Sequence, residues 1–265
     1  MRPGASGLVL YDKPAGITSH DVVAQVRRRL PRRVKVGHAG TLDPFATGLL
    51  LILVGRATRV QRFLMALSKS YVVTARFGAV SSTGDPEGEV AETGVVPDGD
   101  LRLPTGRIKQ RPPAYSAVKV SGRRAYALAR AGTAVELPER EVFVRRFDEI
   151  WRDGPRRGFE IECSSGTYVR SLIAALGDAY CEELRRTRIG PFDVAEADPE
   201  RVTDLNRALG FMAAVELDEE MARRAAHGVA VPGSADAVVR LVDSAGLIAL
   251  AEPRGEKLKP IVVLR

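Results

Sequence analysis

The chain is poor in the residues that build disulfide scaffolds and metal centres. Its 265 residues include only two cysteines and three histidines. Cys163 and Cys181 alone exclude a multi-disulfide framework and a four-cysteine zinc site. His20, His38 and His227 lie too far apart in the sequence for a local metal motif. We therefore expect no metal ion in the fold.

Long apolar runs are also missing. A membrane-spanning helix needs about 20 consecutive apolar residues, and the run from Leu49 to Val54 is far shorter. The N-terminus has no long apolar segment either. With 45% hydrophobic residues, the chain can still form a sizeable core. We expect a soluble, cytoplasmic protein with one large domain, or with a core domain and a small one.

Positive charge is abundant and unevenly distributed. The net charge of the chain is +7. The segment from Leu101 to Arg146 alone carries a net charge of +8, so the remaining residues together carry a net charge of −1. A second basic cluster lies between Arg27 and Lys35. Concentrated positive charge is typical of proteins that bind polyanions, and it favours nucleic acid over an arginine-rich surface without a partner.

One carboxylate stands in an unusual segment, Gly37 to Gly48, which contains three glycines and a proline. Pro44 restricts the backbone of Asp43 to extended conformations, while glycines permit dihedral angles and close approaches that a side chain blocks. A carboxylate held in such a backbone suits a ligand site. The local pattern taken alone favours a simpler interpretation, in which Asp43 caps a helix that begins at Pro44.

Periodicity predicts the elements around this segment. Alternating residues predict strands from Gly7 to Tyr11, from Ser70 to Phe77 and from Phe159 to Cys163. The capping box Thr18-Ser19-His20-Asp21 predicts that a helix begins there.

Helical patterns occur at three further places. A helix with a buried stripe begins near Thr167, and Arg170 stands in its first turn. A basic helix is expected from Arg124 to Arg130, after a short strand at Ala117 to Val120. An acidic helix from Ala213 to Ala226 leads into a block of short strands. These strands are expected over 238–242, 247–250 and 261–264.

Three segments in this order resemble one protein family. They run from Val9 to Gly16, from Gly37 to Leu50 and from Ser165 to Leu172, with Lys69-Ser70-Tyr71 between the last two. They are similar to the bacterial tRNA pseudouridine synthases of the TruB family, which modify uridine 55 in the T loop of tRNA. Three spaced segments make a chance match far less credible than a single short motif would.

The resemblance extends from residue 7 to about residue 205. It implies an α+β fold, in which residues 1–212 form a pseudouridine synthase catalytic domain on a mixed central sheet. Residues 213–265 would then form a small, β-rich PUA-type RNA-binding domain.

The resemblance also implies three catalytic residues. Asp43 would be the nucleophile while the uracil is detached, turned and rejoined to the ribose through carbon. Arg170 would pair with Asp43 and lower its pKa, although a surface arginine at a helix start is the simpler interpretation. Tyr71 would stack on the flipped base and assist proton removal, whereas alternation alone favours a core tyrosine.

Six further residues match positions near the substrate pocket of the family. His38 would fill the gap left by the flipped nucleotide, or it is a hydrogen-bonded loop histidine. For the charged members of the set, a solvated charge beside a turn is individually the stronger interpretation. The implied substrate-binding residues are Lys13, His38, Arg59, Asp85, Tyr168 and Leu184.

The implied substrate is the T-arm stem-loop of tRNA. RNA recognition favours loops, whose bases cost less to extrude than paired ones. The basic segment from Leu101 to Arg146 would hold phosphates. The resemblance implies an enzyme that needs no guide RNA, no membrane, no metal and no organic cofactor. The sequence carries no oligomer signal, and we expect a monomer.

The chain also departs from the family in three places. Only Ala179 to Glu183 separates Asp178 from Leu184, where the family has a longer, glycine-containing stretch, and the segment before Leu103 is short. Ser81-Ser82-Thr83 replaces a common Thr-Asp-Thr. These differences affect loop contacts to RNA rather than the chemistry of Asp43.

Three other functions fit parts of the sequence. An RNA-binding or RNA-folding factor without catalysis explains the charge, but it leaves Asp43, Tyr71 and Arg170 without a task. A subunit of a guide-dependent ribonucleoprotein would carry terminal extensions and a larger PUA domain. A nucleoside hydrolase would need a metal or a carboxylate cluster.

Overall fold

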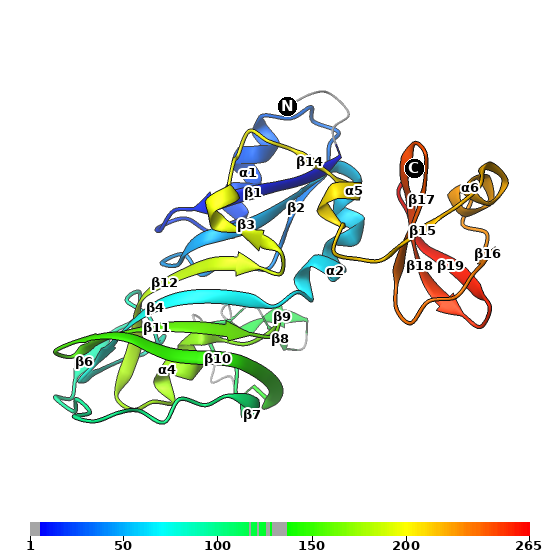
Figure 1. The fold of residues 1–265 in the computed structure, drawn as a ribbon. Coiled ribbons are helices and arrows are strands. Elements are labelled where there is room, and N and C mark those ends of the chain that lie inside the picture. The colour runs from blue at the N-terminus through cyan, green and yellow to red at the C-terminus, as the bar shows by residue number, and fades with distance from the viewer. Residues whose placement is uncertain (1–5, 117, 121, 126–127, 129–136) are drawn as a thin grey trace.

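The computed structural model describes residues 6–116, 118–120, 122–125, 128 and 137–265. Its two main β-sheets have helices beside them (Figure 1). The basic helix predicted over Arg124 to Arg130 lies mostly outside the described residues. Nearby, β8 (Lys119–Val120) and β9 (Arg123–Arg124) form a short antiparallel pair, so the strand expected before that helix is present in part.

The large sheet has ten strands, and two antiparallel halves meet at its centre. The central strand β12 (Ala179–Ile189) runs parallel to β3 (Thr47–Val54) and antiparallel to β4 (Lys69–Phe77). The expected mixed central sheet is therefore confirmed. Eight strands lie in the order β14 (Thr203–Asp204), β1 (Gly7–Lys13), β3, β12, β4, β11 (Arg156–Cys163), β10 (Arg140–Asp153) and β7 (Gly106–Gln110), while β2 (Val36–Ala39) pairs with β3 and β13 (Phe192–Asp193) pairs with β12.

The apolar run from Leu49 to Val54 is buried on both faces of the large sheet. Its odd-numbered residues belong to a cluster with the short helices η1 (Gly55–Val60) and α5 (Leu205–Ala208). Its even-numbered residues belong to a second cluster with α1 (Ser19–Arg28). Strands that are covered on both faces are uniformly apolar, which explains why this segment does not alternate.

The strands predicted from alternation are present as β1, β4 and β11. β1 continues two residues further than predicted, because Asp12 and Lys13 pair with Leu49 and Gly48 of β3. Tyr71 is buried on the core side of β4, as the alternation indicated.

The predicted capping box is confirmed at the start of α1, where the Thr18 hydroxyl accepts from the Asp21 N–H and the Asp21 carboxylate accepts from the Thr18 N–H. The helix expected near Thr167 is α4 (Val169–Ala174), with Arg170 in its first turn. None of the described helices is long and apolar enough to cross a membrane. The remaining elements of this part are α2 (Gln61–Met65), η2 (Val194–Glu196), β5 (Ala79–Ser81) and β6 (Val90–Glu92).

The C-terminal sheet has five strands and its own apolar core with α6 (Glu219–Ala226). The helix predicted from Ala213 to Ala226 is wrong in its first six residues, 213–218. Residues 214–216 instead form a strand parallel to residues 240–242, and Asp218 caps a helix that begins at Glu219. The strand order is β15 (Ala214–Glu216), β17 (Val239–Asp243), β18 (Gly246–Arg254), β19 (Lys257–Val263) and β16 (Val231–Pro232).

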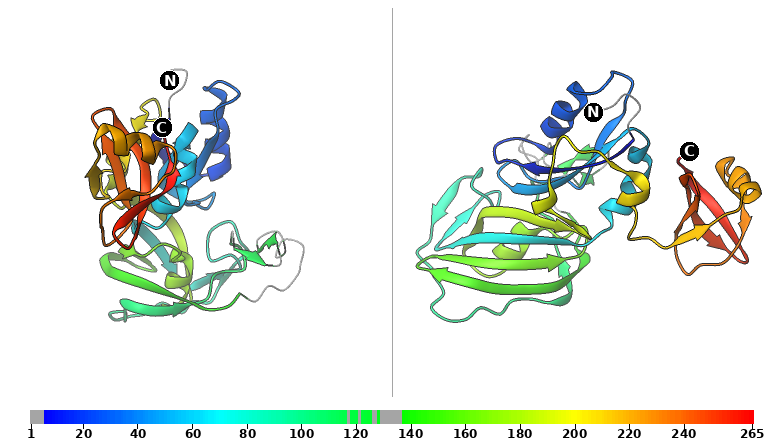
Figure 2. Two further views of the ribbon diagram at one scale, coloured as in Figure 1. Left: turned by 90° about the vertical axis from the view of Figure 1, so that its right-hand side faces the viewer. Right: turned by 45° about the horizontal axis from the view of Figure 1, so that its top comes forward.

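The C-terminal sheet lies to one side of the large sheet, beyond α5 (Figure 2). The two share an apolar cluster, to which the C-terminal part contributes Leu250, Val262 and Leu264. Arg56 donates to the Leu264 carbonyl at 2.7 Å, and Arg59 donates to the Val263 carbonyl. A division of the chain near residue 212 agrees with the change of sheet, but the two parts are packed together.

Candidate active site

Asp43 lies in the turn between β2 and β3. No helix follows it, so the interpretation of Asp43 as a helix cap is wrong. The Ala46 N–H donates to the Asp43 carbonyl at 3.2 Å, and β3 begins at Thr47. The carboxylate is therefore free of capping, and 32% of the side chain is exposed.

Arg170 joins Asp43 to a second carboxylate, Asp85. Its Nε lies 2.9 Å from Asp43 Oδ2, and its Nη1 lies 3.0 Å from Asp85 Oδ2. The same guanidinium donates to the carbonyls of Thr83 at 2.6 Å and Tyr115 at 2.8 Å. The expected pairing of Arg170 with Asp43 is confirmed. Because Arg170 is buried, the interpretation as a surface arginine is wrong.

The expected fall in the pKa of Asp43 is not found. Burial raises the pKa of Asp43 above its ordinary value of 3.8, and the Asp85 charge adds to this rise. The attraction of Arg170, and more weakly that of Lys13, opposes it without cancelling it. Desolvation thus outweighs the ion pair at this carboxylate.

Asp85 is a buried partner of Arg170 rather than a solvated charge. Its Oδ1 accepts from the Thr83 hydroxyl at 2.5 Å and from the Glu87 N–H at 3.1 Å, while its Oδ2 faces Arg170. Both carboxylate oxygens are therefore engaged, and Asp85 acts as a fixed counter-charge.

Lys13 is also buried, contrary to the interpretation of a solvated charge. Its Nζ donates to three carbonyls, those of Pro14 at 2.9 Å, Ile17 at 2.8 Å and Pro44 at 3.1 Å. Burial lowers the pKa of Lys13 to about 8, although Asp43 attracts its charge. Lys13 therefore fixes the backbone directly after Asp43.

Tyr71 and Leu184 belong to the apolar cluster that also contains Leu42, next to Asp43. Tyr71 is 8% exposed and Leu184 is 7% exposed. Burial raises the pKa of Tyr71 to about 12, and the nearby Arg186 guanidinium opposes the rise. The hydroxyl is therefore protonated at neutral pH.

Tyr168 lies beside Arg170 at the start of α4. Gln110 fixes its backbone by accepting from the Tyr168 N–H at 2.8 Å and donating to the Tyr168 carbonyl at 2.9 Å. The Arg140 guanidinium lies 4.7 Å from the centre of the tyrosine ring. Tyr168 thus presents a half-buried aromatic face.

His38 and Arg59 have different surroundings. His38 lies on β2 and His20 lies at the start of α1. The centres of the two rings are 6.1 Å apart, and the rings meet edge to face. Arg59 is exposed and binds the backbone of β19, so it joins the two sheets rather than the Asp43 network.

Two buried polar residues near the site, Gln110 and Arg186, escaped the sequence analysis. Arg186 stands in a run of charged residues on β12, which is typical of an exposed strand. Gln110 ends β7 before two prolines and carries no local signal. Only the tertiary structure brings these side chains to the site.

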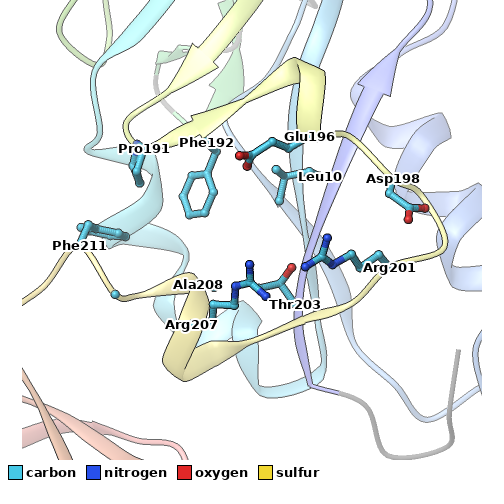
Figure 3. Close-up of a pocket in the computed structure, with 11 residues that line it drawn as sticks. Leu10, Pro191, Phe192, Glu196, Asp198, Arg201, Thr203, Arg207, Ala208 and Phe211 are labelled. Carbon is cyan, nitrogen blue, oxygen red and sulfur yellow. The ribbon is translucent and has the colours of Figure 1, made fainter.

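A separate cavity of about 590 Å³ lies between β1, β13 and α5 (Figure 3). Figure 3 shows Phe192 and Phe211 on one side of it, with Arg201 and Arg207 across from them. Its lining residues do not include Asp43, Arg170 or Tyr71. It is therefore distinct from the candidate active site.

Residues 27–169 match the family model described as "TruB family pseudouridylate synthase (N terminal domain)". The tRNA pseudouridine synthase B of Mycobacterium tuberculosis is 40% identical over 297 aligned positions, which cover 100% of this chain and 98% of that protein. The Thermobifida fusca enzyme of the same name is 42% identical over 291 positions, with 98% of both chains covered. Both alignments are longer than the 265-residue chain, in agreement with its short segments.

Solved structures extend the comparison to the fold. The chain in the structure titled "Crystal Structure of a Cbf5-Nop10-Gar1 Complex" is 25% identical, with a TM-score of 0.72, and the match covers 98% of this chain and 85% of that one. A chain of an H/ACA ribonucleoprotein bound to a substrate RNA is 23% identical with a TM-score of 0.71, which is a likeness of fold. The α+β fold is confirmed, and the chain belongs to the TruB family of pseudouridine synthases.

Proposed function

We propose that this enzyme converts uridine to pseudouridine at position 55 in the T loop of tRNA, with Asp43 as the nucleophile. The observation that carries the proposal is the partly exposed Asp43 carboxylate, held at 2.9 Å by a buried arginine. The relatives that are about 40% identical over the whole chain are named tRNA pseudouridine synthases, which supports tRNA as the substrate.

The reaction moves one bond and needs no added reactant. The bond between the ribose C1′ and the uracil N1 breaks, the base turns, and a bond forms between C1′ and C5. The proton on C5 leaves, and N1 gains one. A carboxylate nucleophile divides such a transfer into easier steps. The Asp43 carboxylate attacks either before or after the glycosidic bond breaks.

The neighbouring side chains have separate tasks. Arg170 orients the Asp43 carboxylate and, with Asp85, balances the charge of the site. Tyr71 offers its ring for stacking and its hydroxyl to assist removal of the C5 proton. Because its pKa is raised to about 12, the Tyr71 hydroxyl is protonated at neutral pH, so it takes up the C5 proton only as it releases its own, and the net change remains one proton lost at C5 and one gained at N1.

The substrate base must leave its stack to reach Asp43. We propose that His38 fills the space it vacates, while Tyr168 and Leu184 line the pocket around it. Lys13 contributes through the backbone that follows Asp43. Arg59 lies outside this group of residues, since its hydrogen bond is to β19.

Nucleoside analysis tests the proposal. Purified protein is incubated with an unmodified T-arm stem-loop transcript, without guide RNA, and the digested RNA is examined for a carbon-linked nucleoside. The parent should form pseudouridine, and Asp43→Asn should form none while it still binds the hairpin. Uridine that stays unchanged with the parent would overturn the proposed function. Turnover by Asp43→Asn would overturn the role of Asp43.

A further inference from the structure

Arg186 occupies the centre of the large sheet. In β12 it lies directly opposite Tyr71 of β4 and beside Gly48 of β3. A side chain at position 48 would place its Cβ 2.2 Å from the Arg186 carbonyl oxygen, and the φ of Gly48 is +102°. Only glycine fits this contact. The backbones of β3 and β12 therefore lie in close contact at Gly48 and Arg186.

The Arg186 guanidinium binds the backbone on both sides of Asp43. Its Nε donates to the Leu49 carbonyl at 2.7 Å, and its Nη2 donates to the Gly40 carbonyl at 3.1 Å. Its Nη1 approaches the Thr41 carbonyl at 3.3 Å. Arg186 thus ties the start of β3 to the beginning of the turn that carries Asp43.

Lys13 completes this arrangement at the other end of the turn, where its Nζ reaches the Pro44 carbonyl. The turn is consequently held by two buried cations, Arg186 on both sides of Asp43 and Lys13 directly after it. Arg186 also lies directly opposite Tyr71 in the sheet, and its charge opposes the rise in the pKa of the Tyr71 hydroxyl. One guanidinium therefore binds the backbone that carries the proposed nucleophile and lies beside the residue that would face the base.

A buried cation of this kind is costly. Arg186 is 2% exposed, and among the described residues it forms no ion pair with a carboxylate. Burial of a charge without a counter-ion is unfavourable unless hydrogen bonds compensate for it. An apolar side chain would fill a strand centre at lower cost, so the charge at this position calls for a functional explanation.

Arg186 is too deeply buried to touch a substrate. We propose that Arg186 is a positioning residue, which holds the turn of Asp43 in one fixed arrangement beside Tyr71 for the isomerisation. This inference rests on the proposed function. It predicts that a change of Arg186 slows the chemical step and leaves tRNA affinity unchanged.

The first test compares Arg186→Lys and Arg186→Gln with the parent. Single-turnover rates with tRNA are measured beside equilibrium tRNA binding, and circular dichroism checks the fold. Lysine retains the charge, but its single ammonium group does not reproduce the three separate donor positions of the planar guanidinium. Both variants should show a rate about tenfold or more below the parent, since removal of one charge-assisted hydrogen bond corresponds to roughly that factor. Binding should stay within about twofold of the parent, a difference under 0.5 kcal/mol.

Arg185→Gln is the matched control. Arg185 is the adjacent, more exposed arginine, and it pairs with Asp12 at 2.7 Å. Its variant should keep the parent rate. A parent-like rate in Arg186→Lys, or a loss confined to tRNA binding, would overturn the proposal.

A double-mutant cycle separates positioning from a general loss of stability. Gly40→Ala disturbs the same interaction from the other side, because Gly40 has a φ of +95°. If Arg186 acts through this turn, the combined loss in rate with Arg186→Lys should be clearly smaller than the product of the single losses. Losses that multiply would overturn the proposal. Uridine that stays unchanged with the parent protein would instead defeat the proposed function, so the two failures are distinguishable.

Discussion

Asp43 and Asp85 both contact Arg170, but their surroundings give them different tasks. The Asp85 side chain is 4% exposed, whereas the Asp43 side chain is 32% exposed. Asp85 has both oxygens engaged by the protein and has no route to a substrate. Asp43 keeps the open side that a nucleophile needs. A buried arginine between two carboxylates can thus fix one acid while it presents the other.

Arg170→Lys should lower the rate of isomerisation by about 100-fold. Lysine cannot reproduce the two-carboxylate geometry, and removing each hydrogen bond to a charged group costs roughly 1.5 kcal/mol. Single-turnover kinetics and tRNA binding, measured on the same preparation, check this result. Arg188→Lys is the control, since that arginine pairs with Asp193 at an exposed site. A parent-like rate in a folded Arg170→Lys would remove Arg170 from the mechanism.

The activity should fall at acid pH with an apparent pKa above 3.8. The Asp43 carboxylate must be ionised to act as the proposed nucleophile, and burial raises its pKa, so activity is expected at neutral pH and is lost as the pH falls through the raised value. Arg170→Gln should move this acid limb to higher pH, because Arg170 opposes the rise. The measurement is kcat/KM against pH. An acid limb at or below 3.8 would show that Asp43 is not the group observed.

The sequence identified Asp43 because glycines and a proline surround it, and the resemblance added Arg170 and Asp85. It held no sign of Arg186, whose importance depends on carbonyls more than 130 positions away in the chain. It also predicted the wrong direction for the pKa of Asp43. Desolvation depends on what covers a group, and a sequence pattern does not reveal that.

The sequence predicts correctly those helices and strands that are determined by neighbouring residues. The capping box of α1 and the alternation of β4 each involve only a few consecutive residues, so both can be recognised in the sequence. Residues 214–216 were predicted as helix but form β15, because their partners on β17 lie 26 positions further along the chain. Non-local pairing can override a helical pattern in this way.

Charge reversal on β7 and just after it should weaken the dependence of RNA binding on salt. Lys109 is exposed on β7, and exposed Arg111 follows it, with its Nη2 3.8 Å from Glu139 Oε1. Lys109→Glu with Arg111→Glu should reduce the slope of log K against log salt by roughly 0.7–0.9 for each phosphate that the variant no longer binds. Binding titrations at several salt concentrations measure the slope.

Arg254→Glu is the control for this prediction, since that exposed arginine lies on β18 and pairs with Glu252. An unchanged slope in the double variant would place the RNA on another surface.

At the scale of the whole molecule, the C-terminal sheet is part of the structural support of the large sheet. Leu250, Val262 and Leu264 share an apolar cluster with residues of β1 and β3. A chain ending near Met212 would uncover this cluster. Such a truncation should therefore be less stable and should also bind tRNA more weakly.

Leu250→Ala should lower the temperature at which hairpin isomerisation is lost. Removal of a fully buried leucine side chain costs about 2–5 kcal/mol, and Leu250 lies in the shared cluster. Leu241→Ala is the control, because Leu241 is equally buried but belongs to the separate core of the C-terminal sheet. Equal inactivation temperatures for the two variants would argue against the interpretation that packing of the C-terminal sheet stabilises the large sheet.

The proposed isomerisation of one uridine in the T loop of tRNA by Asp43 is tested by mapping pseudouridine, position by position, in an unmodified whole tRNA transcript treated with the purified protein and no guide RNA. We predict pseudouridine at position 55 with the parent and at no position with Asp43→Asn. Absence of pseudouridine with the parent, its formation at other positions only, or equal yields from both proteins would overturn this function of Asp43.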